Sequence, residues 1–429
     1  MFMIGIPGTE RWLAKKRGLM KTSARSIFFV FMIVGITEMV GLVGFHTYLA
    51  EANPSGFSKI WTAFDRGFGY NDATALTHQA ADNLLAGKNP YANSNVVTAL
   101  LRFNPYSDRV TPLKEGKFAN SFPYPTSAQL EQVWEDVIKN PQQIPVEYAS
   151  NLSYPSGSFL LPIPFMLAAK AAGLPEPDFR IIFTIFVLTA LIYVTFLIPG
   201  KKRFLFLGLL LISFDLWNSI ADGETGSLVF PFLLLAFVLV KRKAWLSGIF
   251  MGIAVATKQT AWFFLPFYLI MVFNTSSFKK FGVTALIVAG VFSAMNLPFM
   301  VLDIKLWFAS IFNPMSGDIY PLGVGVVTLV TGGLLNIQSP FIFDVMEFTV
   351  LGLGVCWYFF YYRRYPYLGP VLAVFPLFFA WRSLWPYFFY TVIILLAMYL
   401  TTPDSLKGES ENNISAVLRT HKAPPVTQP

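Results

Sequence analysis

One aspartate stands out at the start of a helical pattern in an otherwise strongly apolar sequence. Asp72 lies near the start of the stretch FGYNDATALTHQAADNLLAGKNPY, and an alanine- and leucine-rich run follows it. As a helix N-cap, Asp72 would accept a hydrogen bond from an amide near Thr74 or Ala75, which contributes about 1 kcal/mol. A carboxylate fixed in this way could also take a proton from a hydroxyl group in a reaction. Both interpretations fit the local sequence.

Two cations, Lys258 and Arg382, interrupt apolar segments further along the chain. A charge in such surroundings is costly, so it is expected to face a polar cavity or a partner. Lys258 could pair with Glu224 or Asp222 and simply hold helices together. Arg382 could be an interfacial anchor beside its neighbouring tryptophans. The alternative for both cations is that they bind an anionic substrate.

Composition places these residues in a membrane protein. Of the 429 residues, 55% are hydrophobic and only 13% are charged, whereas a soluble domain carries about a quarter charged residues. Several apolar runs reach the roughly 20 residues that a helix needs to cross ~30 Å of hydrocarbon.

The only cysteine, Cys356, lies in an apolar run, which excludes a disulfide framework and a cysteine-based metal site. The net charge of +8 lies largely in the leader and short loops. Since no basic groove with interleaved aromatic residues is visible, we expect no nucleic-acid partner.

The basic residues also predict how the chain crosses the membrane. Residues 1–25 are a basic leader, expected in the cytoplasm, and the apolar run 26–50 is too long for a cleavable signal peptide and is interpreted as the first transmembrane span. The positive-inside rule then makes residues 51–155 a large extracytoplasmic loop, before a polytopic membrane domain at 156–401. Residues 402–429 are polar and are predicted to be a disordered cytoplasmic tail. The turns expected on the cytoplasmic side carry four basic clusters, at 201–203, 241–243, 279–280 and 363–364.

Two apolar segments do not fit this alternation as full spans. The segment Gly157–Ala172 is short and contains two prolines, and Leu322–Leu335 is rich in glycine. Both are predicted to be embedded without crossing, because irregular backbone is tolerated in the membrane only where protein buries it. The segment Trp245–Met271 is either two short helices with Lys258 at the outer turn or one tilted helix with Lys258 buried. The predicted fold is an all-α polytopic membrane protein with about ten transmembrane helices, one or two non-spanning segments and a helical first extracytoplasmic loop.

The run after Asp72 predicts a helix that lies along the membrane surface. Gly87 can end this helix, and Pro90 prevents its continuation. His78 is expected on its polar side. The apolar residues that share one face of the helix are Leu76, Ala80, Ala81, Leu84 and Leu85.

A series of motifs follows in a fixed order along the chain. After the leader and the first span come the early aspartate with LLAGKNPY, then YPSGSFLLPIPF, DGETG, GIFMGIAVATKQTAWFFLPF, MNLPF and FFAWRSLWPYFF. This order resembles the GT-C-type integral-membrane glycosyltransferases, in particular the polyprenyl-phosphate-sugar-dependent mannosyl- and arabinosyltransferase-like group. The resemblance covers about residues 26–400. It implies a multi-pass protein of the cell membrane that transfers a sugar from a polyprenyl phosphate on the extracytoplasmic side.

The resemblance also implies a position for the catalytic carboxylate. The family places an essential acidic residue in the first outer loop, and Asp72 matches that place best, with Asp65 as the runner-up. Some relatives carry two adjacent acidic residues there, whereas Asn71 precedes Asp72 in this chain. We therefore predict no metal and no cofactor.

Transfer from a lipid phosphate is a displacement at the anomeric carbon of the sugar. One carboxylate can take the proton of the acceptor hydroxyl, and a single displacement inverts the anomeric centre. A cation stabilises the leaving phosphate, and Arg382 is preferred over Lys258 because a guanidinium binds phosphate through two parallel hydrogen bonds. Tyr154 could instead belong to an interfacial aromatic belt, and Asp222 and Glu224 could instead solvate a loop. The residues expected to contact substrate are Tyr154, Asp222, Glu224, Gln259 and His78.

The expected partners are a polyprenyl-phosphate-linked sugar, membrane lipids and an acceptor that is a lipid, a glycan or a protein. Two rival functions are kept. A transporter or flippase for a lipid-linked sugar would be expected to show internal repeats and charges deep in spans. A surface-polysaccharide polymerase or ligase typically has its large outer loop late in the chain, whereas the large loop predicted here comes first.

Overall fold

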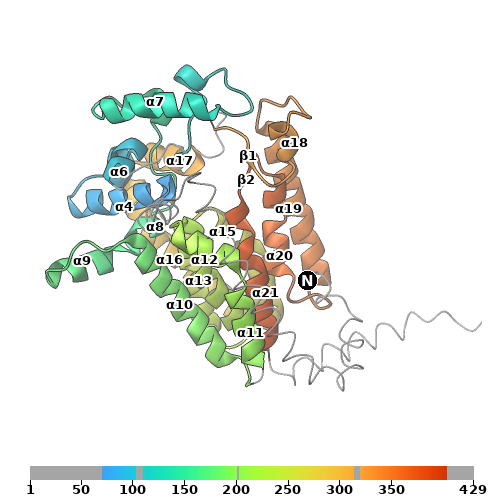
Figure 1. Ribbon diagram of the computed structural model, residues 1–429. Helices are drawn as coiled ribbons and strands as arrows, with labels where there is room; N and C mark the ends of the chain where they lie inside the picture. The colour runs from blue at the N-terminus through green and yellow to red at the C-terminus, as the bar shows by residue number, and fades with distance from the viewer. Residues whose placement is uncertain (1–69, 103–109, 201, 314–318, 403–429) are drawn as a thin grey trace, which may run out of the picture.

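The computed structural model describes residues 70–102, 110–200, 202–313 and 319–402 (Figure 1). The predicted leader, the first span at 26–50, the runner-up Asp65 and all but the first residue of the predicted tail lie outside these residues. The described chain is helical apart from one two-stranded sheet and an isolated bridge, as expected for the all-α class.

A bundle of apolar helices surrounds α13 (Thr225–Leu239) in the lower part of Figure 1. Every residue of α13 is buried, as expected for a helix that is apolar on all sides and occupies the centre of a bundle. It packs against α10 (Phe179–Leu197), α14 (Ala244–Thr257) and α21 (Phe389–Thr401). Because α13 is central, its first residues lie within one end of the bundle.

Three described helices are long and apolar enough to cross a membrane: α10, α16 (Phe278–Leu302) and α19 (Phe341–Tyr361). The pair α11 (Lys202–Leu211) and α12 (Phe214–Ala221), bent by 53°, would be a fourth if it acts as one span. Six shorter apolar helices of 10–17 residues accompany them within the described ranges. Length and composition thus support a helical membrane protein, while the prediction of about ten spans remains a prediction.

Neither segment predicted to be embedded without crossing forms a helix of membrane length. The first is divided into α8 (Gly157–Leu160) and α9 (Ile163–Ala171), and α9 projects sideways from the bundle in Figure 1. The glycine-rich second segment contains β1 (Leu322–Gly323) and α18 (Thr328–Thr331), joined by irregular backbone.

Lys258 lies at a break between two helices. α14 ends at Thr257 and α15 (Thr260–Thr275) begins three residues later, with Lys258 in an extended conformation between them. The two short helices predicted for this segment are confirmed, and the position of their turn on the outer side remains a prediction. A Cβ on Gly157 would lie 2.5 Å from the Thr257 hydroxyl oxygen, so α8 approaches the end of α14 as closely as only a glycine permits.

A layer of short helices covers the upper end of the bundle in Figure 1 and comes from the segment predicted as the outer loop. Its first helix confirms the one predicted after Asp72, and Gly87 adopts a positive φ of 73° shortly after its end. The elements of this layer are α4 (Asp72–Leu85), α5 (Pro90–Asn93), α6 (Val96–Arg102), η3 (Gly116–Phe118), α7 (Ser127–Lys139) and η4 (Val146–Tyr148).

Two predictions about α4 are wrong. Its N-cap is Asn71, whose side-chain oxygen accepts a hydrogen bond from the Thr74 amide at 2.9 Å, and Asp72 is the first residue inside the helix. His78 was expected on a polar face, but its side chain is only 2% exposed. Glu176, in the loop before α10, and Phe179, the first residue of α10, contact its ring.

The remaining elements bring two distant parts of the chain together. β1 pairs in parallel with β2 (Arg382–Ser383), and Leu322 lies opposite Arg382. This small sheet links the connection between α17 and α19 to the chain that enters α21. The other elements are α17 (Ile304–Phe312), α20 (Gly369–Val374), η6 (Pro376–Phe379) and η7 (Trp385–Tyr387).

Candidate active site

The Asp72 carboxylate is held by two backbone amides. Its Oδ1 accepts a hydrogen bond from the Ala73 amide at 2.7 Å, and its Oδ2 accepts one from the Thr111 amide at 2.9 Å. The second amide belongs to a different part of the outer layer, so tertiary structure as well as the helix orients the carboxylate. The side chain remains partly exposed. Asp72 is therefore a carboxylate held in a fixed direction, and Asn71 rather than Asp72 is the N-cap of α4.

Lys258 is buried at the helix break and is surrounded by polar and aromatic groups. Its Nζ donates a hydrogen bond to the Thr225 hydroxyl at 2.8 Å. The same Nζ lies 5.5 Å from the ring centres of both Tyr154 and Tyr387, within cation–π distance. The carboxylate of Glu224 also acts on Lys258 electrostatically. Lys258 thus lies beside the first residue of α13, inside the end of the bundle.

Arg382 presents a buried donor that lacks a partner. Within the part of the chain that the structure describes, its Nη1 is buried without a hydrogen bond. An unsatisfied buried donor costs about 1–3 kcal/mol, and more when it is charged, so the group is suited to an anionic ligand. The tryptophans beside it do not form an anchor pair: Trp381 is buried and donates to the Ile319 carbonyl, whereas Trp385 is exposed and donates to Asp215.

Two glycines allow β1 to approach β2, the strand that carries Arg382. Gly323 has a φ of 132°, which L side chains rarely adopt, and a Cβ there would overlap the Ser383 carbonyl. A Cβ on Gly325 would overlap the Phe378 carbonyl and lie 2.6 Å from the Ser383 hydroxyl oxygen. The glycine-rich segment therefore serves to place Arg382.

This packing gives a first prediction. Gly325→Ala should lower the free energy of unfolding by about 1–3 kcal/mol, because the added methyl group overpacks a buried contact. It should also lower sugar-transfer activity by displacing Arg382. Gly352→Ala is the matched control, since a Cβ at that position in α19 meets nothing within 4 Å. Thermal unfolding of the purified protein in detergent measures both variants; equal melting temperatures would show that the close approach is not required.

Three tyrosines lie near the charged residues of this site, and two of them interact with Asp72, Lys258 and Arg382 alike. Burial raises the pKa of the Tyr124 phenol, which the positive charge of Arg382 lowers and the negative charge of Asp72 raises. Burial and then the charge of Asp72 raise the pKa of Tyr154, with Arg382 again acting in the opposite direction. Tyr387 also interacts electrostatically with both Arg382 and Asp72. Asp72 and Arg382 therefore act on all three tyrosines, and two of these, Tyr154 and Tyr387, also lie beside Lys258.

The residues predicted to contact substrate divide into two groups. Tyr154 and Glu224 lie at this cluster, through their interactions with Lys258. Gln259 donates hydrogen bonds from its side-chain amide to the carbonyls of Ser153 and Ile311, the latter at 2.8 Å, so its donor group is already engaged. Asp222 accepts a hydrogen bond from Asn218 at 2.9 Å, one turn earlier in the chain.

His78 is engaged elsewhere. Its ring stacks on Phe179 with 4.0 Å between ring centres, and its Nε2 lies 2.8 Å from Glu176 Oε1. Burial lowers the pKa of His78, and the hydrogen bond and charge of Glu176 oppose this shift. His78 therefore already contacts Phe179 and Glu176, and its assignment as a substrate ligand stays a prediction.

Sequence reasoning missed three members of the cluster. Tyr124 and Tyr387 carry no local signal, since tyrosines are common throughout the chain. Glu347 is buried in α19 and acts electrostatically on Tyr387. An acidic residue inside an apolar run is a signal that could have identified it.

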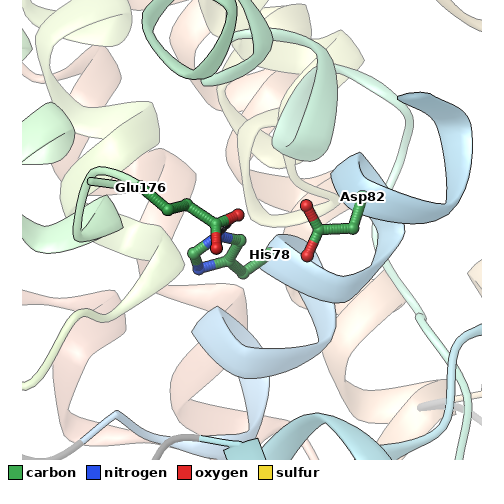
Figure 2. A group of neighbouring side chains, drawn as sticks. All are labelled: His78, Asp82 and Glu176. Atoms are coloured by element: carbon green, nitrogen blue, oxygen red, sulfur yellow. Dashed lines mark hydrogen bonds and ion pairs between the residues drawn. The ribbon is translucent and has the colours of Figure 1, made fainter. Parts of the chain in front are cut away.

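Asp72 belongs to no group of three or more potential metal ligands in the described residues. The one such group there consists of His78, Asp82 and Glu176 (Figure 2). A cavity lined by Lys241, Arg242 and Tyr367, among others, lies near the opposite end of α13 and α21 from Lys258 and is not part of this cluster.

The fold and the cluster define a helical membrane protein in which one carboxylate, Asp72, and two cations, Lys258 and Arg382, act on shared tyrosines. The chain belongs to glycosyltransferase family 87, whose family model matches residues 152–375, just over half of the chain. It is therefore a membrane glycosyltransferase. No curated protein and no solved structure matches it significantly. Tyr154 and Lys258 lie within the matched residues, whereas Asp72 and Arg382 lie outside them.

Proposed function

We propose that the protein is an inverting glycosyltransferase that moves a sugar from a polyprenyl phosphate to an acceptor hydroxyl at the extracytoplasmic face of the membrane. The family assignment supports sugar transfer rather than transport. The observation that carries the finer proposal is the convergence of Asp72, Lys258 and Arg382 on shared tyrosines. A base and two cations in one place are what displacement of a lipid phosphate requires.

In the proposed reaction, Asp72 is the general base. It takes the proton of the acceptor hydroxyl as the hydroxyl oxygen forms a bond to the anomeric carbon. The bond between that carbon and the phosphate oxygen breaks, and the electron pair leaves with the lipid phosphate. One displacement inverts the anomeric centre. The two amides that hold Asp72 fix the direction of the carboxylate before the substrate arrives.

Arg382 and Lys258 are proposed to stabilise the leaving phosphate. The unpartnered Nη1 of Arg382 offers a desolvated donor, which is worth more in such a site than in water. Lys258 already binds Thr225 and interacts with Glu224, so it has competing partners in this state. The α13 N-terminus beside Lys258 adds backbone N–H groups that favour an anion. We therefore rank Arg382 above Lys258 as the phosphate ligand.

The sugar is proposed to lie between the phosphate ligands and Asp72. Tyr154 and Tyr387 offer ring faces there, and Glu224 and Glu347 offer acceptors for sugar hydroxyls. Gln259, Asp222 and His78 are left out of this proposal because other contacts engage them. The acceptor class, whether lipid, glycan or protein, is left open.

Incubation of membranes containing the protein with radiolabelled polyprenyl-phosphate sugars tests the proposal. We expect label to move to an acceptor from one such donor, and the product to have the inverted anomeric configuration. Nucleotide sugars are the control and should not donate directly to purified protein. Direct use of a nucleotide sugar would overturn the proposed donor, and retention of configuration would overturn the single displacement.

A transport assay with the purified protein in liposomes distinguishes transfer from the flippase alternative. We expect no protein-dependent movement of a labelled polyprenyl-phosphate sugar between leaflets, because the family assignment supports sugar transfer. Protein-dependent movement without sugar transfer would favour the flippase.

A further inference from the structure

A cavity at the end of the bundle opposite Lys258 takes no part in the proposed reaction. Residues from the ends of α13 and α21, from α15 and from the loop before α20 line it. Its volume is about 140 Å³, close to the roughly 150 Å³ of an engineered protein cavity that binds benzene. The cavity is therefore large enough for a phosphate group and a few attached atoms.

Two cations, Lys241 and Arg242, line this cavity, and no carboxylate of the described residues does. The Nζ of Lys241 lies 5.8 Å from the ring centre of Tyr367, which also lines the cavity. Partial burial lowers the pKa of the Lys241 ammonium, and no acidic group within the described ranges opposes this shift. The charge of Lys241 is thus not compensated by the surrounding protein that the structure describes.

Arg242 is held beside the cavity but keeps most of its donors. Its Nη2 donates a hydrogen bond to the Thr401 carbonyl at the end of α21, at 2.6 Å, and a guanidinium has five N–H groups. The hydroxyls of Thr401 and Thr402 donate to backbone carbonyls one turn earlier, at 2.7 and 2.8 Å. Since these hydroxyl protons are engaged, an anion in the cavity would be bound by Lys241 and Arg242.

The two turns beside the cavity add further positive charge. The turn at 240–244 carries three consecutive cations, the turn at 362–368 carries Arg363 and Arg364, and neither contains an acidic residue. Both are among the basic clusters that the positive-inside rule predicts on the cytoplasmic side. Anionic lipids give that leaflet a negative surface potential. The charge of this region is therefore complementary to an anionic lipid surface.

We propose that the cavity binds the phosphate group of an anionic membrane phospholipid, with Lys241 and Arg242 as its ligands. Phe237, Val238 and Met398 line the same cavity, and such apolar side chains suit the glycerol carbons and first methylene groups of a lipid. Free phosphate would gain nothing from these side chains, which favours a lipid as the source. A bound lipid would hold the ends of α13 and α21 and the loop before α20 together.

The test uses the purified full-length protein in an uncharged detergent, after bound lipid has been removed. Native mass spectrometry counts bound lipids, and thermal unfolding measures their effect. We expect one phosphatidylglycerol to bind tightly per chain and to raise the melting temperature. Phosphatidylcholine and inorganic phosphate at the same concentration should not raise it. An equal rise with phosphatidylcholine would overturn the preference for an anionic lipid, and an equal rise with inorganic phosphate would overturn the lipid as the source.

Two variants test the proposed ligands. Lys241→Gln should weaken phosphatidylglycerol binding about fivefold, the contribution of one cation near an anionic lipid surface. The melting temperature of its lipid-free form should be nearly unchanged, because Lys241 forms no hydrogen bond or ion pair within the described residues. Lys241→Gln combined with Arg242→Gln should weaken binding about 25-fold.

A matched control separates the cavity from general attraction to positive charge. Lys279→Gln combined with Lys280→Gln removes two exposed cations from the first turn of α16, which does not line the cavity. This variant has the same net charge as the double variant of the cavity, and it should bind phosphatidylglycerol as the unmodified protein does. If both double variants weakened binding equally, or if Lys241→Gln left it unchanged, the proposal would be wrong. None of these measurements depends on the proposed sugar transfer.

Discussion

Replacing Asp72 with Asn is expected to lower the rate of sugar transfer by about 10²–10⁴-fold, the range that a positioned general base contributes. The amide of Asn has no basic oxygen that could take the acceptor proton. Binding of the polyprenyl-phosphate sugar should change little, because the phosphate is assigned to Arg382 and Lys258. The measurement is the transfer rate at saturating donor, together with the donor dissociation constant.

The structure shows that this replacement also has a structural cost. Both carboxylate oxygens of Asp72 accept backbone hydrogen bonds, from Ala73 and Thr111, and an Asn side chain offers only one acceptor oxygen. One amide loses its partner, and we expect the free energy of unfolding to fall by about 1–3 kcal/mol. The loss of activity must therefore be separated from this loss of stability.

Asn71→Ala is the matched control. It removes the N-cap of α4, which costs about 1 kcal/mol, but leaves the Asp72 carboxylate in place. We expect this variant to melt lower yet retain most of its transfer rate. If Asp72→Asn and Asn71→Ala lost activity to the same extent, Asp72 would be a structural residue and the catalytic proposal would be wrong.

The features that could be predicted from the sequence are those that local patterns encode. The helix after Asp72 follows from the spacing of its apolar residues and from Gly87 at its end. The break at Lys258 follows from a polar interruption in a segment too long for one relaxed helix. The helix and the break both depend on residues within a few positions of each other. The spacing of apolar and polar residues along the chain was therefore enough to predict them.

Features that depend on contacts between distant segments could not be predicted in the same way. Asn71 rather than Asp72 caps α4, and the aspartate instead accepts a hydrogen bond from the amide of Thr111, 39 residues further along the chain. His78 is buried because the residues before α10 fold over it. The tyrosines that connect the site come from the outer layer and from the chain before α21, and nothing near them in sequence marks their position.

Replacing Arg382 with Lys is expected to lower kcat/KM for the lipid-phosphate donor by about 10–150-fold. This range corresponds to the loss of a charge-assisted hydrogen bond, worth about 1.5–3 kcal/mol. Lys keeps the positive charge but presents a single ammonium group in place of two parallel N–H donors, so it does not reproduce bidentate phosphate binding. Arg382→Ala should lose more, about 10²–10³-fold, because the leaving phosphate then lacks this cation. Steady-state kinetics with a purified donor measure both variants.

The comparison of Lys with Arg also decides between the two roles considered for Arg382. An interfacial anchor needs only a long side chain with a charged end, and Lys supplies one equally well. A phosphate ligand needs the planar guanidinium, whose Nη1 lies buried without a partner. Arg180→Lys is the matched control, because Arg180 pairs with Asp178 at the start of α10, and it should leave the donor kcat/KM nearly unchanged. Full activity of Arg382→Lys would assign Arg382 to the anchor role, and Lys258 would then be the remaining cation available to the leaving phosphate.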